Sequence, residues 1–318
     1  MSGTGAVSGG AMGGVLRHWR LVLPMLAVWA VVYWDGYAAA GVDAGSWRFW
    51  AADLNPVPWL GALILFGVYV ARYDGYRAGG GDAGRWSRWR IASFVAGVLL
   101  ALALWESPLN GFVGRSMTLY TVKLMGEFEF AAPLIVLGIP FELIDSARAK
   151  GGWWSVLRVL HRPMVTAVGL AVILALWDMT DQMAVGLRNA LVFGILPGVY
   201  LGLGMIVWMQ SMQALPAFPN LTSHLRKGVY VWAMELAMMA MGAVWFWSAM
   251  RGMNPAVGAP LVWGVSRVAD EHLAGAVMTG LSFPTMCLVF WHFWQWIASL
   301  VGVSENEDYA GTPGRQEV

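Results

Sequence analysis

Charged residues are scarce in this chain, and cysteine is nearly absent. Of its 318 residues, 12% are charged and 58% are hydrophobic, and the mean hydropathy is +0.58. This composition excludes a disordered chain and argues against a water-soluble globular protein. The formal net charge of +1 gives no reason to expect a nucleic-acid partner. The single cysteine, Cys287, can form neither an internal disulfide nor a thiolate zinc site, and its apolar surroundings predict a small buried thiol.

Familiar signatures of catalysis are also missing. The sequence contains no phosphate-binding glycine loop, no GxSxG nucleophile elbow and no HExxH zinc motif. We therefore expect no enzymatic activity. A cleavable signal peptide would show a short apolar core followed by a small-residue cleavage site, whereas the first apolar run is long enough to be kept as a membrane span.

Long apolar runs are what the chain has in abundance, each near the ~20 residues that a helix needs to cross a bilayer. Eight can be counted, at residues 21–40, 57–72, 91–106, 116–141, 163–180, 190–211, 229–250 and 274–300. Many of the 20 tryptophans lie at the ends of these runs, as in aromatic belts. We predict an all-α bundle of about eight transmembrane helices, or seven if one run is re-entrant. The expected organisation is a tail at 1–20, a single helical domain at 21–301 and a tail at 302–318.

The distribution of lysine and arginine predicts the orientation of the bundle. With the N-terminus in the cytoplasm, fourteen of the 20 basic residues fall in cytoplasmic segments and five fall outside, with Lys123 inside a span. This bias predicts that both tails lie on the cytoplasmic side. The segment 71–90 is the most basic predicted loop. A topology signal is its simplest interpretation, and binding of anionic lipid or an acidic partner is the alternative.

One span, 116–141, carries three charged residues near its middle: Lys123, Glu127 and Glu129. A charge in hydrocarbon costs about 2.5–3.5 kcal/mol on insertion scales, so each of these residues needs a reason. Lys123 and Glu127 are four residues apart and share a helix face, so we expect them to pair. Glu129 lies about 200° round the helix from Glu127 at ~100° per residue, so it must face another helix, a water pocket or a partner protein.

Further polar and thioether side chains complete the set of candidate functional residues. The polar ones are Asp178, Glu235, Asp270 and His272. Together with the charged span they could form a proton or cation path, but no regular ladder of acids is evident, which favours structural contacts between helices. Three methionines at i, i+4 and i+7 could form a face that binds Cu(I): Met234, Met238 and Met241. Methionine stripes at this spacing more often serve packing.

The five histidines do not predict a metal or haem site. His18, His161 and His224 fall at predicted cytoplasmic span ends, where solvated side chains are expected. His272 and His292 are twenty residues apart, about 30 Å along a helix, and cannot ligate one metal together. A haem would need two histidines at matching depth, and the sequence predicts no such pair.

Several motifs follow one another in a characteristic order. They are RWSRWRIASFVAGVLLALALWESPL at 85–109, APLIVLGIP at 132–140, HRPMVTAVGLAVILALWDM at 161–179, GLGMIVWMQ at 202–210 and VADEHLAG at 268–275. In this order and spacing they resemble the bacterial CtaG-like family of cytochrome c oxidase assembly factors, over roughly residues 60–300. The resemblance implies a multi-pass protein of the bacterial inner membrane with a haem–copper oxidase among its partners.

The chain departs from this family at the intramembrane histidines that are thought to handle copper. The corresponding positions hold Tyr120, Leu124, Asp178, Phe193 and Pro197. Tyrosine, leucine, phenylalanine and proline cannot replace soft or borderline metal ligands, so copper insertion by that route is not expected. Asp270 of the family's A-D-Q-x-x-A-G motif is kept, with Glu271 in place of the glutamine.

Three functions fit these features. We prefer a non-enzymatic accessory or structural subunit of a membrane respiratory or energy-converting complex. A copper-delivery or assembly factor for a haem–copper oxidase is the alternative, and a proton-coupled transporter, which rests on the buried acids alone, is the third. The expected partners are other membrane-protein subunits and bound phospholipid. No cofactor is expected, with copper as the alternative.

Overall fold

The computed structural model describes residues 56–82, 84–105, 116–140, 153–175, 190–212, 221–247 and 264–301. All regular structure within these ranges is helical, as the sequence predicts. Seven of the eight predicted apolar runs coincide with helices. The run at 21–40 and both predicted tails lie outside the described residues.

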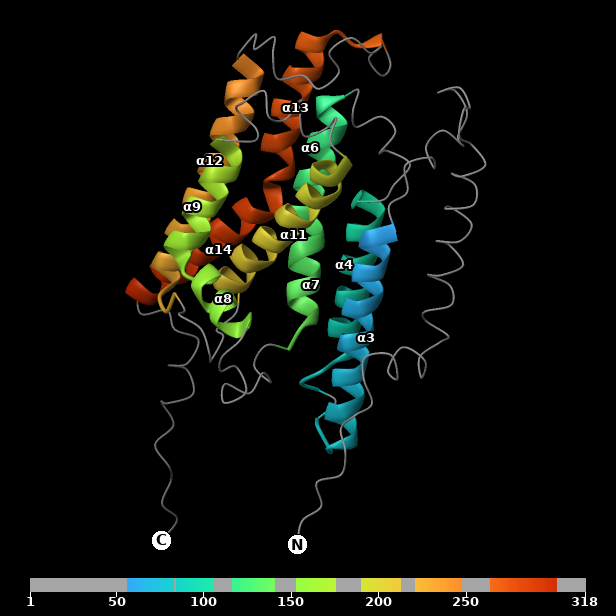
Figure 1. Cartoon of the computed structure of the whole chain (residues 1–318). Coiled ribbons are helices and arrows are strands. Elements are labelled where there is room, and N and C mark those ends of the chain that lie inside the picture. Colours follow the sequence, from blue (N-terminus) through green and yellow to red (C-terminus); the bar gives the residue numbers. More distant parts are fainter. Residues whose placement is uncertain are drawn as a thin grey trace, which may run out of the picture.

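The helices form an elongated bundle (Figure 1). In chain order they are α3 (Pro56–Ala78), α4 (Arg88–Trp105), α6 (Met117–Gly126), the π-helix η2 (Glu127–Ala131), α7 (Ala132–Gly138), α8 (Trp153–Leu160), α9 (Pro163–Ile173), α11 (Ala190–Met212), α12 (His224–Trp247), α13 (Arg267–Leu281) and α14 (Phe283–Leu300). The elements α6, η2 and α7 follow one another directly, and we call them the central rod. Ser282 and Pro284 mark the bend at which α13 passes into α14.

Three helical segments are long and apolar enough to cross a membrane by length and composition: Arg88–Trp105, His224–Trp247 and Arg267–Leu300. Two shorter apolar helices, Pro163–Ile173 and Leu196–Met212, accompany them. Large apolar side chains face outward on these helices, among them Phe290, Trp291 and Trp294 of α14. A hydrocarbon solvent accounts for such a surface, so the chain is a helical membrane protein. The full number of spans and the side on which the tails lie stay predictions.

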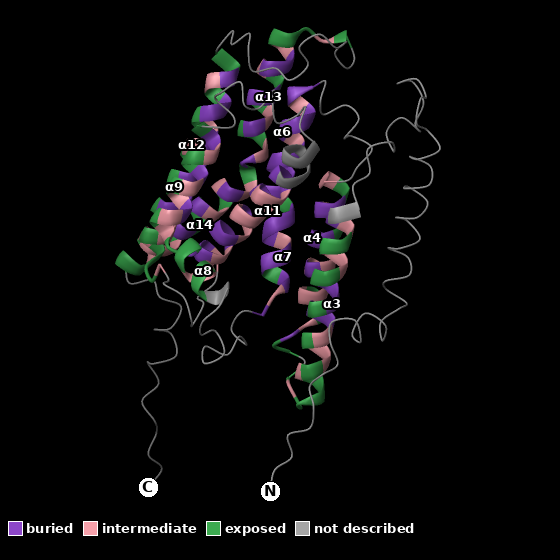
Figure 2. Ribbon diagram, viewed as in Figure 1, coloured by how far each residue is buried: buried purple, intermediate pink, exposed green. Residues whose placement is uncertain are grey.

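The central rod lies between two groups of helices. On one side, α4 packs against α7 and η2, and α3 packs against α4. On the other side, α13 packs against α6, and α12 packs against both α13 and α14. The helix α11 runs along η2 and α7. Figure 2 shows buried residues throughout the rod, whereas α3, α8 and α14 turn exposed faces outward.

Glycines allow the helices of this bundle to approach closely. A Cβ atom at Gly97 of α4 would lie 2.7 Å from the backbone nitrogen of Ile135 on α7, and one at Gly204 of α11 would lie 3.0 Å from the backbone of Phe128. Because lipid is as apolar as leucine, helices in a membrane gain their affinity from such close packing and from hydrogen bonds rather than from a hydrophobic effect. Small residues therefore seat the rod between α4 and α11.

Aromatic residues fasten α3 to the rest of the bundle. The indole Nε1 of Trp86 donates to the Tyr69 hydroxyl at 2.8 Å, and that hydroxyl donates to the Gly138 carbonyl at 2.9 Å. The rings of Tyr69 and Phe94 stack at 3.8 Å. The helix α3 continues to Ala78 and α4 begins at Arg88, so the predicted loop 71–90 is helical at both ends.

The expectation for Cys287 is wrong: this residue is exposed rather than buried. The buried face of α14 is formed by Thr285, Val289 and His292, which are spaced at i, i+4 and i+7. Cys287 is two residues from Thr285, about 200° round the helix, so it points outward. An apolar run that is buried by lipid does not have to be buried by protein.

Candidate functional site

The backbone of the central rod departs from α-helical geometry where the sequence places two glutamates. Pro133 has no amide hydrogen and its ring crowds the preceding turn, and the segment before it, Glu127–Ala131, forms a π-helix. In a π-helix the Phe128 carbonyl would bond to residue 133, which is this proline. The indole Nε1 of Trp208 on α11 donates to that carbonyl instead, at 3.0 Å. The irregular turn is thereby held inside protein, as a membrane requires.

Three carboxyl groups are buried around this π-helix. The side chains of Glu127 and Glu129 on the rod and of Glu235 on α12 are each 0% exposed. The Thr285 hydroxyl of α14 donates to the Glu129 carboxylate, so Glu129 faces another helix. Glu235 interacts electrostatically with Glu129, and Ser282, at the bend between α13 and α14, is a polar neighbour of Glu235. We call these groups the buried acid cluster.

Lys123 and Glu127 share a face but are not joined by a hydrogen bond. The Lys123 ammonium, which is also buried, donates to the backbone carbonyl of Trp105 at the end of α4, at 2.9 Å. Its charge acts on the Glu127 carboxylate, whose two oxygens have no hydrogen-bond partner among the described residues. The predicted pairing is therefore electrostatic. The hydrogen bond that the lysine donates goes to the end of α4 instead and helps to fix the position of that helix.

Asp270 holds the first turn of α6 from a different helix. Its carboxylate accepts hydrogen bonds from the Met117 amide at 2.6 Å and the Thr118 amide at 3.3 Å. The hydroxyls of Ser116 and Thr118 donate to the same carboxylate, each at 2.8 Å. The amides at a helix N-terminus have no partner within their own helix and carry a partial positive charge, which an anion stabilises. Asp270 thus acts as a cap supplied by α13.

Two polar candidates remain, His272 and Asp178. His272 is half-buried on α13 and its ring lies 5.3 Å from that of Phe246 on α12. Asp178 lies outside the described residues.

The histidines do include a facing pair, contrary to the expectation from the sequence. The Nδ1 atoms of His224 on α12 and His292 on α14 are 3.2 Å apart. The two residues are 68 positions apart in the chain, and only the packing of α12 against α14 brings them to one depth. His292 is deeply buried, while His224 is exposed at the first residue of α12.

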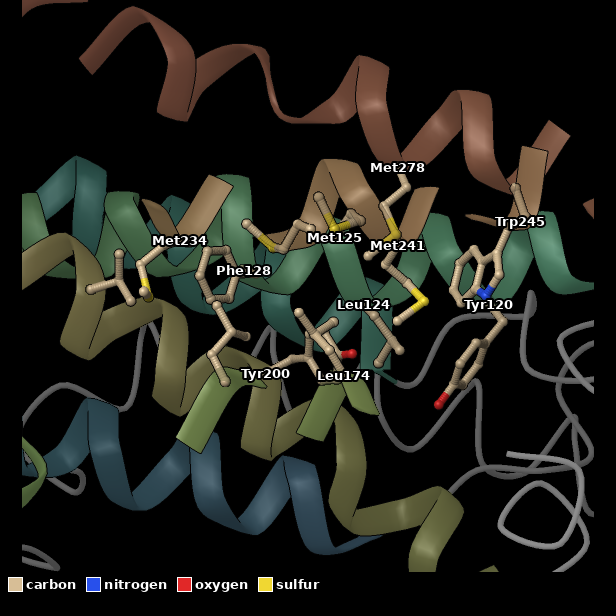
Figure 3. Close-up of a cluster of buried hydrophobic side chains, with 14 of the residues drawn as sticks. Tyr120, Leu124, Met125, Phe128, Leu174, Tyr200, Met234, Met241, Trp245 and Met278 are labelled. Carbon is tan, nitrogen blue, oxygen red and sulfur yellow. The ribbon is translucent and has the colours of Figure 1, made fainter. Parts of the chain in front are cut away.

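The methionine candidates are core residues. Met234, Met238 and Met241 on α12 belong to the main hydrophobic cluster. Figure 3 shows Met234, Met241, Met125 and Met278 among leucine and aromatic side chains of several helices. In the part of the chain that the structure describes, no three histidine, cysteine, aspartate or glutamate side chains are grouped so that they could hold a metal ion. Of the soft metal ligands predicted from the sequence, the three methionine thioethers of α12 do lie together in one cluster.

The fold and the buried polar groups define a helical membrane protein whose central rod carries an irregular, acid-rich turn. The family model of the cytochrome c oxidase caa3 assembly factor matches residues 65–299. The chain therefore belongs to the cytochrome c oxidase caa3 assembly factor family. This confirms the resemblance found in the sequence and its approximate extent. No curated protein and no solved structure matches the chain.

The hydrogen bond from Thr285 to Glu129 makes a prediction about the role of this glutamate. We expect Glu129→Gln to change the free energy of unfolding by less than about 1 kcal/mol, because its amide oxygen still accepts from Thr285. Glu129→Leu leaves a buried hydroxyl without an acceptor and should cost about 1–3 kcal/mol. Thermal unfolding in detergent measures both. Thr285→Val should remove the difference between the two variants, and equal stability of the two in wild-type Thr285 background would contradict the assigned bond.

Proposed function

We propose that this chain serves the assembly of a caa3-type cytochrome c oxidase as a non-enzymatic membrane partner, bound to oxidase subunits through its outer helix faces. Its family membership supports the choice of oxidase. The match covers the central rod and all helices packed on it, so the proposal concerns the whole described bundle.

The packing of Tyr120 and Leu124 is the observation that favours a role in protein contact over a role in binding copper. These residues stand where the resemblance implies histidines. Their side chains are 2% and 3% exposed and belong to the main hydrophobic cluster (Figure 3). Pro197, at a third such position, is a buried residue within α11. Apolar and aromatic atoms therefore occupy the positions of the implied histidines, and no imidazole ligand for a transition metal is present at Tyr120, Leu124 or Pro197.

The outer faces of the bundle supply a surface for such contacts. The helix α14 exposes Phe283, Phe290, Trp291 and Trp294, and α12 exposes Trp232 and Trp247. Tryptophan and phenylalanine are enriched where proteins meet other proteins, and lipid satisfies the same side chains in the free protein. A helical partner can displace that lipid without opening the core.

Affinity purification from native membranes tests the proposal. A tagged chain, solubilised in mild detergent and passed through gel filtration, should carry oxidase subunits in near-stoichiometric amounts, and a strain lacking the chain should contain less assembled oxidase by haem a absorbance. Association that disappears once the oxidase is mature would assign the chain to assembly alone. Normal oxidase content in the deletion strain, with no oxidase subunit recovered, would overturn the proposal.

Copper delivery is the second candidate, and the gathered thioethers favour it. Cu(I) prefers soft sulfur ligands. Six methionines from three helices lie in one buried cluster: Met117, Met125, Met234, Met238, Met241 and Met278. Under our proposal the protein, once treated with a chelator that removes exchangeable ions, should contain almost no copper. Stoichiometric copper that is lost in Met238→Leu, but kept in the exposed control Met164→Leu, would reverse the ranking of the two functions.

A further inference from the structure

We propose that His224 and His292 form a binding site for a divalent late-transition-metal ion, of the Zn²⁺ or Cu²⁺ class, at the end of the bundle where α12 begins. The site is separate from the buried acid cluster and from the methionine cluster. It does not depend on the proposed role in oxidase assembly.

The distance between the two imidazoles suits a bent metal bridge. Two metal–nitrogen bonds of about 2.0–2.1 Å span the observed 3.2 Å between Nδ1 atoms when the angle at the metal is about 100°, near the tetrahedral value. A haem is excluded at this spacing, because axial nitrogens on opposite sides of one iron stand about 4 Å apart. A linear two-coordinate ion is excluded for the same reason.

The local packing holds one of these ligands in place. His292 is 3% exposed on the inner face of α14, and its Nε2 is buried with no hydrogen-bond partner among the described residues. The backbone of Ser211 on α11 faces the same ring. A histidine that ligates a metal usually directs its other ring nitrogen at a backbone carbonyl or similar acceptor, which fixes the tautomer. The Ser211 backbone beside the ring can serve as that acceptor, which leaves the Nδ1 atom of His292 to face His224.

A glycine one turn into α12 permits the histidines to meet. A Cβ atom at Gly228 would lie 3.3 Å from the Cβ of His292 and 3.4 Å from the ring of Phe293. Without a side chain there, the start of α12 lies against α14, and His224 is directed over His292. His224 itself is exposed, so water or a donor molecule can supply the remaining ligands.

The charges around the pair indicate modest affinity. Lys227 acts electrostatically on His292, and Arg226 lies on the same turn of α12. Neighbouring cations oppose the binding of another cation, and two imidazoles are fewer protein ligands than a closed structural zinc site has. The site therefore suits an ion that exchanges with solution rather than one that holds the fold together. Since copper(II) exceeds zinc in intrinsic affinity for nitrogen ligands, we expect Cu²⁺ to bind more tightly than Zn²⁺.

Metal titration of the full chain in lipid nanodiscs tests this site. After treatment with chelator, one Zn²⁺ should bind per chain in competition with a fluorescent indicator. We expect His224→Ala and His292→Phe each to weaken binding by about 10–100-fold, while His272→Ala, a histidine on α13 outside the pair, leaves it unchanged. The paramagnetic resonance spectrum of bound Cu²⁺ should show two coordinating nitrogens in the wild type and one in His224→Ala.

Using both His224→Ala and His292→Phe distinguishes the loss of a metal ligand from a failure to fold. His224 is exposed, so its alanine variant should keep the wild-type gel-filtration profile even if the buried His292→Phe does not. Zinc binding that persists unchanged in His224→Ala would mean an adventitious ion only and would overturn the proposal. So would failure of the wild type to bind more Zn²⁺ than His224→Ala. Loss of zinc binding without any effect on oxidase recovery would separate this site from the assembly function.

Discussion

Asp270→Ala should lower the free energy of unfolding by about 2–4 kcal/mol, among the largest effects of any single truncation in this bundle. The carboxylate accepts bonds from two backbone amides and two hydroxyls at the start of α6. Alanine leaves all four donors without this acceptor in a buried setting and removes the anion that stabilises the helix N-terminus. Thermal unfolding of the purified protein in detergent, followed by gel filtration, measures the loss.

Two variants separate the cap from a general effect of charge. Asp270→Asn keeps one acceptor oxygen, so its stability should fall between wild type and alanine. Glu271→Gln removes a carboxylate from the adjacent buried residue, which is not among the side chains that bond to the first turn of α6 in the described structure. This variant should cost less than either. If Asp270→Ala unfolds at the wild-type temperature, the carboxylate does not anchor α6 as described.

Gly275→Ala should destabilise the packing of α12 on α13 by about 1–3 kcal/mol. A Cβ atom at this position would collide with the Gly242 carbonyl oxygen and lie 2.9 Å from the Phe246 backbone nitrogen. Both obstacles are backbone atoms of α12, so no side chain can rotate aside, and the helices must separate. The measurement is again thermal unfolding in detergent, together with the fraction of protein recovered as a monodisperse peak.

Gly280, five residues further along α13, is the matched control. A Cβ atom there would meet nothing within 4 Å. Alanine in a helix is favoured over glycine by about 1 kcal/mol, so Gly280→Ala should be neutral or slightly stabilising. Equal behaviour of the two alanine variants would show that α12 and α13 are not in the close contact described here.

Hydrophobic runs predict the helices of this chain well, because a helix that crosses a bilayer needs a long apolar segment, and few other structures require one. They predict less well which face of a helix meets protein. On α14 the buried Thr285 and the exposed Cys287 lie in the same apolar run. The polar residues provide the missing signal: Thr285 and His292 mark the inward face by their spacing of seven residues.

The candidate site is predictable residue by residue but not in its partners. The sequence places Lys123, Glu127 and Glu129 at bilayer depth. It also predicts that Glu129 lies on a different face of the helix from Glu127. It does not identify Thr285 as the donor, because Thr285 is 156 positions further along the chain. The His224–His292 contact is missed for the same reason, since distances along one helix say nothing about a neighbouring helix. Pro133 is the one local signal for the π-helix that spans both glutamates.

The capping of α6 by Asp270 also bears on the order in which the protein matures. Met117 and Asp270 are separated by 153 residues, so the amides enter the membrane long before the ribosome has made the carboxylate that binds them. Until α13 is inserted, the acid-bearing rod has no anchor of this kind at its first turn. Closure of the bundle is therefore a late event of biosynthesis. A nascent chain that ends before α13 would contain both glutamates of the rod but lack the Asp270 carboxylate that caps α6.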